Sequence, residues 1–315
     1  MRDASFDPRP PTRPLSQRPL TATSAASPMP TREVRTPPTD ISEYLVDLPP
    51  VPTVAVKVMH LVDDPDTSAQ TLARTIAADQ AISFKVLQMA NSAYYGQGRQ
   101  ILTLSQAVTV LGQRTIRSLV LLYSIPASLK RGGKTGPEEA ALWEHSVGTA
   151  LAARLLARAA GGLDAEAMFA AGLLHDIGKS ILLIKSPAGM AEVLYSAWPP
   201  GGNTGKEIEK SRFGFDHEEI GGRILDEWQM PALFSSAARW HHAPALAGDQ
   251  HRPVRVVAVA NRIAHHLGLG GPADPVAWPD VLALAEPLGL HAGQLETTDV
   301  ETVNQLTAER SLYDL

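Results

Sequence analysis

The sequence LLHDIGK, residues 173–179, decides the fold class of this 315-residue chain. It ends an apolar helical stretch with an imidazole and a carboxylate side by side, those of His175 and Asp176. Both side chains can bind one divalent metal ion if Gly178 loosens the turn there. The pair alone is weak evidence, because a histidine in the last turn of a helix also interacts favourably with the helix dipole.

Histidines on other segments extend this pattern. In chain order the set consists of His145, His175 with Asp176, His217, and His241 with His242. Each member lies on a separate predicted helix, and the set predicts one pocket at which these helices meet. The pair His265 and His266 also lies near a predicted helix end but has no such context, and we interpret it as structural.

The flanking sequence has helical periodicity and no clear period-2 strand pattern, so we predict an all-α protein. Ser105 is expected to cap a helix that ends at Gly112, and Asp164 to cap the helix that leads to the His-Asp pair. Asp216 with Glu219 resembles a capping box.

The composition of the first 40 residues differs from that of the rest of the chain. Residues 1–40 are rich in proline and lack apolar periodicity, which predicts a disordered tail. We expect one domain at 41–270, with an N-terminal helical half at 41–130 packed against a second half at 138–270 that carries the histidines. Residues 271–315 contain weaker amphipathic stretches and are expected to form a helical extension.

Several short motifs accompany the ordered histidines. They are LPPVP at 48–52, NSAYYG at 91–96, QAV at 106–108, FDH at 215–217 and WHH at 240–242. The histidine order resembles the HD superfamily of metal-dependent phosphohydrolases. The N-terminal motifs make the chain similar to one branch of it, the HDOD family, the HD-related output domain of bacterial signalling proteins. The resemblance implies a multi-helix HD-like bundle.

The resemblance also implies roles for individual residues. Lys179 would face a phosphate, and a later aspartate of catalytic HD enzymes is replaced here by Asn261. The tripeptide typical of relatives that hydrolyse cyclic-di-GMP is not found. The implied metal ligands are His145, His175 and Asp176, with His217, His241 and His242 as secondary ligands.

Charge bears on how many metal ions this set could hold. It contains a single carboxylate, that of Asp176. Two dications about 4 Å apart repel by roughly 16 kcal/mol at an effective dielectric constant of about 20. We therefore expect no two-metal hydrolytic centre. One divalent ion (Fe, Mn, Zn, Ni or Mg) on the first three ligands is compatible with the set.

Two functions follow from these residues. The first is a non-catalytic signal-transduction or regulatory module that acts through protein partners or a nucleotide second messenger, and Asn261 favours it. The alternative is a metal-dependent phosphohydrolase, a nucleotide or cyclic-dinucleotide phosphodiesterase. It is favoured by the retained pair His175 and Asp176 and by His217, His241 and His242.

The composition also excludes several kinds of site and partner. The absence of cysteine excludes disulfides, thiolate zinc sites and iron–sulfur clusters. The formal net charge of −5 argues against nucleic acid as a partner. No apolar run approaches the ~20 residues of a membrane helix, and the N-terminus shows no apolar signal-peptide core. We therefore expect a cytoplasmic location and no membrane contact.

Overall fold

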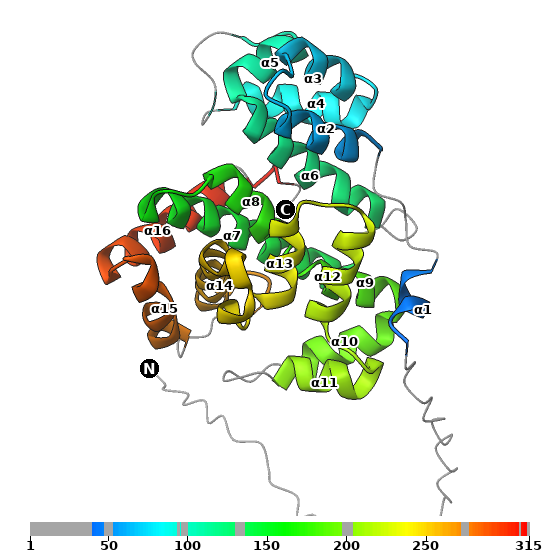
Figure 1. Ribbon diagram of the computed structural model, residues 1–315, viewed down its shortest axis with the longest axis vertical. Helices are drawn as coiled ribbons and strands as arrows, with labels where there is room; N and C mark the ends of the chain where they lie inside the picture. Colours follow the sequence, from blue (N-terminus) through cyan, green and yellow to red (C-terminus); the bar gives the residue numbers. More distant parts are fainter. Residues whose placement is uncertain are drawn as a thin grey trace, which may run out of the picture. The chain divides into compact units, whose positions relative to one another are not determined.

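The computed structural model describes residues 40–46, 53–92, 95, 100–129, 136–196, 204–271, 277–308 and 310–313. Every regular element in these ranges is a helix, which confirms the all-α prediction (Figure 1). The predicted tail at 1–40 lies outside the described residues except for Asp40, and so does most of the loop between the two halves.

The first group of helices packs around its own apolar residues, among them Leu72, Ile76 and Val86, all fully buried. The group consists of α2 (Thr53–Asp63), α3 (Ala69–Ile76), α4 (Gln80–Ala90), α5 (Leu104–Leu111) and α6 (Gln113–Leu129). The N-cap of α5 is Thr103, whose side chain forms a capping box with Gln106, so the prediction of Ser105 is wrong by two residues. Gly112 ends this helix as predicted, with a φ of 81°.

Helix α6 connects this group to the rest of the chain, because it packs both on α2 and on α8. The guanidinium of Arg117 on α6 lies 3.2 Å from Asp63 and 3.5 Å from Asp164. The hydroxyl of Ser118 donates to the Glu166 carbonyl at 3.0 Å. Asp164 is also the N-cap of α8, as predicted from the sequence.

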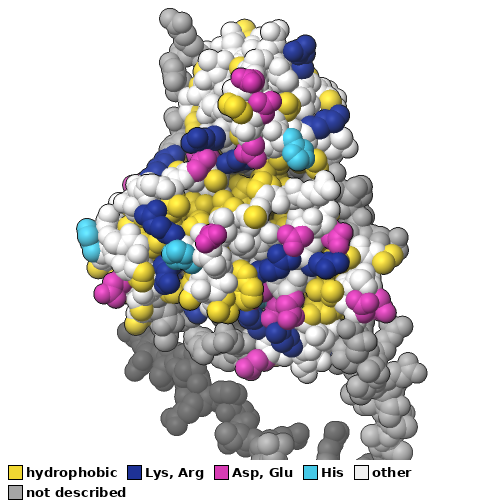
Figure 2. Space-filling view, viewed as in Figure 1, with side chains coloured by type: hydrophobic (Ala, Val, Ile, Leu, Met, Phe, Trp, Pro, Cys, Tyr) yellow, Lys and Arg dark blue, Asp and Glu magenta, His cyan; other side chains and the backbone are white. Residues whose placement is uncertain are grey.

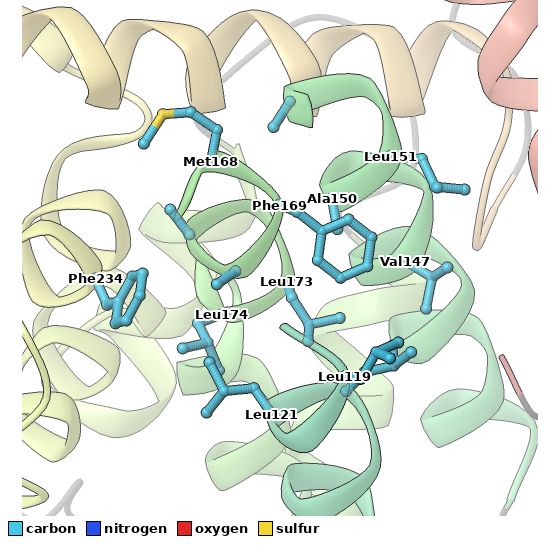
Figure 3. Packing of buried hydrophobic residues seen from close by; sticks show 14 of the residues in the cluster. Leu119, Leu121, Val147, Ala150, Leu151, Met168, Phe169, Leu173, Leu174 and Phe234 are labelled. Atoms are coloured by element: carbon cyan, nitrogen blue, oxygen red, sulfur yellow. The ribbon is translucent and has the colours of Figure 1, made fainter. Parts of the chain in front are cut away.

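The second group of helices is built on the pair α7 and α8, whose apolar side chains fill the centre of the core together with those of α6 and α13 (Figure 3). A Cβ on Gly172 of α8 would lie 2.9 Å from the backbone of Ala150 on α7, so glycine allows the two helices to approach closely. The group consists of α7 (Pro137–Ala160), α8 (Ala165–Leu174), α9 (Ile177–Lys185), α10 (Pro187–Ser196), α11 (Thr204–Phe213), α12 (His217–Glu227), α13 (Ala232–Trp240), η1 (Pro244–Leu246), η2 (Gly248–Gln250) and α14 (His251–His266).

The residues after 270 form α15 (Ala277–Ala285), η3 (Glu286–Leu288) and α16 (Ala292–Ala308). Helix α15 packs on α14, and α16 packs on α7. The indole N–H of Trp143 donates to the Tyr313 carbonyl at 2.7 Å, and the Tyr123 hydroxyl donates to the Leu312 carbonyl at 2.9 Å. These C-terminal residues thus belong to the same core as α6 and α7.

Buried side chains of α9, α10 and α11 form a smaller apolar cluster. The short helix α1 (Ser42–Leu45) contributes to it through Tyr44. The ring of Tyr44 meets Phe213 and Phe215 edge-on, at centroid distances of 6.2 and 4.9 Å. These contacts attach the segment that follows the N-terminal tail to the helices next to the histidines.

One stretch of the described residues, Ala165–Lys185, is long and apolar enough to cross a membrane by length and composition alone. The prediction that no apolar run approaches that length is therefore wrong. However, 78% of its most apolar window is buried inside the protein, and the stretch is interrupted at His175 and Asp176.

Candidate metal centre

The turn between α8 and α9 carries His175 and Asp176. Gly178 lies in the first turn of α9 and does not have a positive φ. A Cβ at this position would lie 2.0 Å from the His217 carbonyl oxygen. Gly178 therefore lets the start of α12 approach the turn, and the expectation that it loosens the turn itself is wrong.

Three of the predicted ligands form a first trio, His145, His175 and Asp176, with one ligand atom each within 4.8 Å of the others. The Nε2 atoms of His145 and His175 lie 3.7 and 3.4 Å from Asp176 Oδ2. His175 donates its Nδ1 proton to the Gly172 carbonyl at 2.7 Å, which leaves a lone pair on Nε2.

The other predicted ligands form a second trio, His217, His241 and His242, again with one ligand atom each within 4.8 Å of the others. The Nε2 atoms of His217 and His241 are 3.4 Å apart and lie 3.4 and 3.5 Å from Asp176 Oδ1. Asp176 thus turns Oδ2 to the histidines of its own trio and Oδ1 to the second trio. These distances confirm that the six residues converge, whereas their role as ligands stays a prediction.

Lys179 lies at the same place. Its ammonium is 2.6 Å from Asp176 Oδ2, and its side chain is 16% exposed. Burial opposes the charge of Asp176, but His175 and Lys179 more than offset it and hold the pKa of this carboxyl well below its usual range. Burial also opposes the charge of Lys179, but Asp176 and Glu209 raise the pKa of its ammonium. The two side chains therefore form an ion pair.

Two buried carboxylates near the second trio are absent from the sequence-based set. Glu209 on α11 accepts hydrogen bonds from the backbone N–H of His217 at 2.8 Å and from its Nδ1 at 2.7 Å. Glu218 accepts from the backbone N–H of His242 at 3.2 Å and forms an ion pair with Lys206. The prediction of a single carboxylate at the site is therefore too low. The charge of Glu218, however, is paired with that of Lys206.

The protonation states suit metal binding. Burial lowers the pKa of His145, His241 and His242, so these imidazoles stay neutral and keep a lone pair. For His217, burial works in the same direction, but the Glu209 carboxylate reverses it and raises the pKa. A metal ion at His217 would have to compete with a proton.

Asn261 lies beside the first trio, as predicted, on α14 and only 2% exposed. Its Oδ1 is 3.0 Å from His145 Nε2, while His145 Nδ1 is 3.3 Å from the Leu269 carbonyl. The ring of His265, one turn further along α14, lies 4.6 Å from the ring of His145. The interpretation of His265 as a residue without context is therefore wrong.

The donor set fits a divalent ion. Among the described residues, the buried atoms His175 Nε2, Asp176 Oδ1 and His242 Nε2 have no hydrogen-bond partner. Unpartnered buried polar atoms are costly unless something binds them. Imidazole nitrogens with one carboxylate oxygen are typical ligands of zinc and neighbouring transition metals.

Comparison with known proteins adds a family and a fold. The family model of the HDOD domain matches residues 48–244. A curated protein of Treponema pallidum (strain Nichols), named "Uncharacterized protein", is 28% identical over 231 residues. That alignment covers 70% of this chain and 43% of the relative, so the chain spans less than half of the relative's length.

Three solved structures share the fold. An HDOD domain protein of unknown function from Geobacter sulfurreducens has a TM-score of 0.70 at 24% identity, and the match covers 87% of this chain and 96% of that one. A "putative phosphohydrolase" from Shewanella amazonensis SB2B has a TM-score of 0.68 at 20% identity, covering 87% and 97%. A "putative signal transduction protein" from Marinobacter aquaeolei VT8 has a TM-score of 0.67 at 23% identity, covering 85% and 59%.

Proposed function

Since the chain belongs to the HDOD family, we propose that it is a regulatory module of bacterial signal transduction which binds a divalent metal ion and does not hydrolyse phosphoesters. The Marinobacter protein, which shares the fold, is named a signal transduction protein, and this likeness of fold supports a signalling role.

The observation that carries the proposal is the pairing of Asn261 with His145. The Asn261 oxygen lies 3.0 Å from His145 Nε2 at the position where the resemblance to HD enzymes implies an aspartate. A neutral amide binds a divalent ion more weakly than a carboxylate does. Asp176, the carboxylate shared by both trios, is in addition neutralised by Lys179 at 2.6 Å. The negative charge that Asp176 and Asn261 offer to two dications is therefore small.

The residues that would hold a single ion are those of the two trios. Such an ion would supply Lewis-acid chemistry to a bound phosphate or water. The chain's own side chains keep the imidazoles neutral through burial and orient His217 through Glu209. In a regulatory module, the ion would link α9, α12 and α13 and so stabilise one arrangement of these helices.

The test combines metal analysis with a substrate screen. Purified full-length protein is loaded separately with Zn²⁺, Mn²⁺ and Fe²⁺ and assayed on cyclic dinucleotides, nucleotides and bis-p-nitrophenyl phosphate. We expect metal binding that is lost in His241→Ala, and turnover no higher than in that variant. Hydrolysis present in the wild type and lost in His175→Ala would overturn the proposal.

The second candidate, a metal-dependent phosphohydrolase, is favoured by Glu209 and Glu218. Both are buried next to the second trio and add negative charge that the ordered histidines alone do not reveal. The substrate would be a nucleotide or cyclic dinucleotide, with Lys179 as the cation nearest to its phosphate.

The partners belong to the proposal as well. We expect signalling proteins or a nucleotide second messenger in the cytoplasm, and no nucleic acid. On the face seen in Figure 2, Lys and Arg side chains are interspersed with Asp and Glu rather than gathered into one basic area. Isothermal titration with cyclic dinucleotides and with a DNA duplex separates these partners.

A further inference from the structure

We propose that the ammonium of Lys179 is the resident cation of the first trio, so that this chain takes a single divalent ion, at the second trio and Asp176 Oδ1. The inference rests on the metal binding proposed above and adds where the ion binds and why only one does.

The negative charge of the first trio is neutralised by the chain itself, although His175 Nε2 has no hydrogen-bond partner. Lys179 Nζ lies 2.6 Å from Asp176 Oδ2, the oxygen that also faces His145 and His175. His145 Nε2 lies closer to Asn261 Oδ1, at 3.0 Å, than to Asp176 Oδ2, at 3.7 Å. A dication at the first trio would meet the ammonium of Lys179.

The second trio has the opposite arrangement. His217 Nδ1 donates to Glu209 at 2.7 Å, and His241 Nδ1 donates to the Ala237 carbonyl at 3.1 Å. Each Nδ1–H leaves a lone pair on Nε2, and these two Nε2 atoms are 3.4 Å apart. Lone pairs that face each other at this distance repel unless a cation or a proton lies between them.

Asp176 and His242 complete the set of donor atoms. Asp176 Oδ1 lies 3.4 and 3.5 Å from the same two Nε2 atoms. Among the described residues, neither Asp176 Oδ1 nor His242 Nε2 has a hydrogen-bond partner. Three imidazoles and one carboxylate oxygen suit a borderline ion such as Zn²⁺ or Co²⁺ and are a poor match for Mg²⁺.

The stoichiometry of binding tests the role of Lys179. Full-length protein is dialysed against Zn²⁺ or Co²⁺, and bound metal is measured by elemental analysis, which no cysteine complicates. Wild type should hold one ion per chain. Lys179→Met should gain a second ion, whereas Lys179→Arg should not, because it keeps the charge. Lys185→Met removes a cation from the last turn of the same helix and should leave one ion bound.

The location of the ion is tested by removing one imidazole from each trio. His241→Ala should weaken Zn²⁺ binding about 100-fold or more, whereas His145→Ala should change the Kd by less than about threefold. These two variants decide the location even if Lys179→Met fails to fold. The Co²⁺ absorption spectrum of wild type should persist in His145→Ala.

The outcomes separate the two proposals. Two ions in wild type, or a loss in His145→Ala as large as in His241→Ala, would overturn the role of Lys179 while leaving metal binding intact. One ion in Lys179→Met with unchanged affinity would also overturn it. No ion in the wild type would instead refute the metal binding on which this inference rests.

Discussion

Asp176 illustrates how much one side chain can decide at this site. Its two oxygens face different histidines, and one of them already contacts an ammonium. The balance of charge around Asp176 therefore depends on single residues. Asn261, which contacts His145, can be changed to a carboxylate by one substitution.

Asn261→Asp should allow the first trio to bind a divalent ion in addition to the one at the second trio, because a carboxylate binds metal more strongly than an amide and adds negative charge beside Lys179. Calorimetric titration with Mn²⁺ and Zn²⁺ measures the change. The gain should be smaller in a His175→Ala background, since both side chains would bind the same ion. Identical titrations of wild type and Asn261→Asp would show that this position does not contribute to metal binding.

His265 makes the stability of the metal-free protein depend on pH. Burial, followed by the nearby Lys179, lowers the pKa of His265 to about 3 from an unfolded value near 6.5. The unfolded chain therefore binds a proton that the folded chain does not, and stability is lost as the pH falls below 6.5, by about 1.4 kcal/mol per pH unit.

Urea denaturation in the presence of a chelator at pH 7 and pH 5 measures this loss. His265→Gln should lose less stability between the two pH values than wild type. His145, His241 and His242 act in the same direction and His217 in the opposite one. The substitution also removes the effect of His265 on the pKa of His145, which adds to the difference between the two proteins. An identical loss in both would refute the assignment to His265.

At the scale of helices, the approach of α12 to the turn after α8 depends on Gly178. Gly178→Ala would place its Cβ 2.0 Å from the His217 carbonyl. We expect a loss of about 1–3 kcal/mol in unfolding free energy together with weaker metal binding, because the second trio is displaced. Urea denaturation and calorimetric metal titration measure the two effects.

Gly293→Ala is the matched control. It lies in α16, and its Cβ would meet only ring atoms of His291 at 3.8–3.9 Å. Alanine at an unobstructed helical position should stabilise the protein by about 0.5–1 kcal/mol. If both variants behaved alike, helix propensity rather than the contact with α12 would explain the effect of Gly178→Ala.

The helices were predictable where the signal lies within a few residues. Asp164 and Asp216 cap their helices as expected, because a capping side chain and its N–H partners are close in sequence. Thr103 was missed in favour of Ser105 because both are good caps two residues apart. The order of the histidines predicted that six residues converge, which local sequence alone does not indicate.

What the sequence did not reveal depends on tertiary contacts. Glu209 lies among the charged residues of α11, a pattern that also fits a solvated helix surface, yet it is 1% exposed. The proximity of His265 to His145 depends on how α14 crosses α7. The role of Gly178 depends on the path of α12, which lies about 40 residues further along the chain.

At the scale of the whole chain, the predicted N-terminal tail can be tested by truncation. Deleting residues 1–40 should change Tm by no more than about 2 °C, because a Pro-rich segment without apolar periodicity buries little surface. Deleting 1–46 removes Tyr44 and its contacts with Phe213 and Phe215, and should lower Tm by about 4 °C or more. Thermal denaturation followed by circular dichroism measures both, and a large drop for the shorter deletion would contradict the predicted boundary.

The hydrogen bonds from Tyr123 and Trp143 to the carbonyls of Leu312 and Tyr313 have a consequence for biosynthesis. They join residues 189 and 170 positions apart in sequence. At about 5–20 residues per second, a ribosome needs roughly 10–40 s to make the intervening chain. During that interval Tyr123 of α6 and Trp143 of α7 lack these partners. The nascent protein therefore completes its core late in translation.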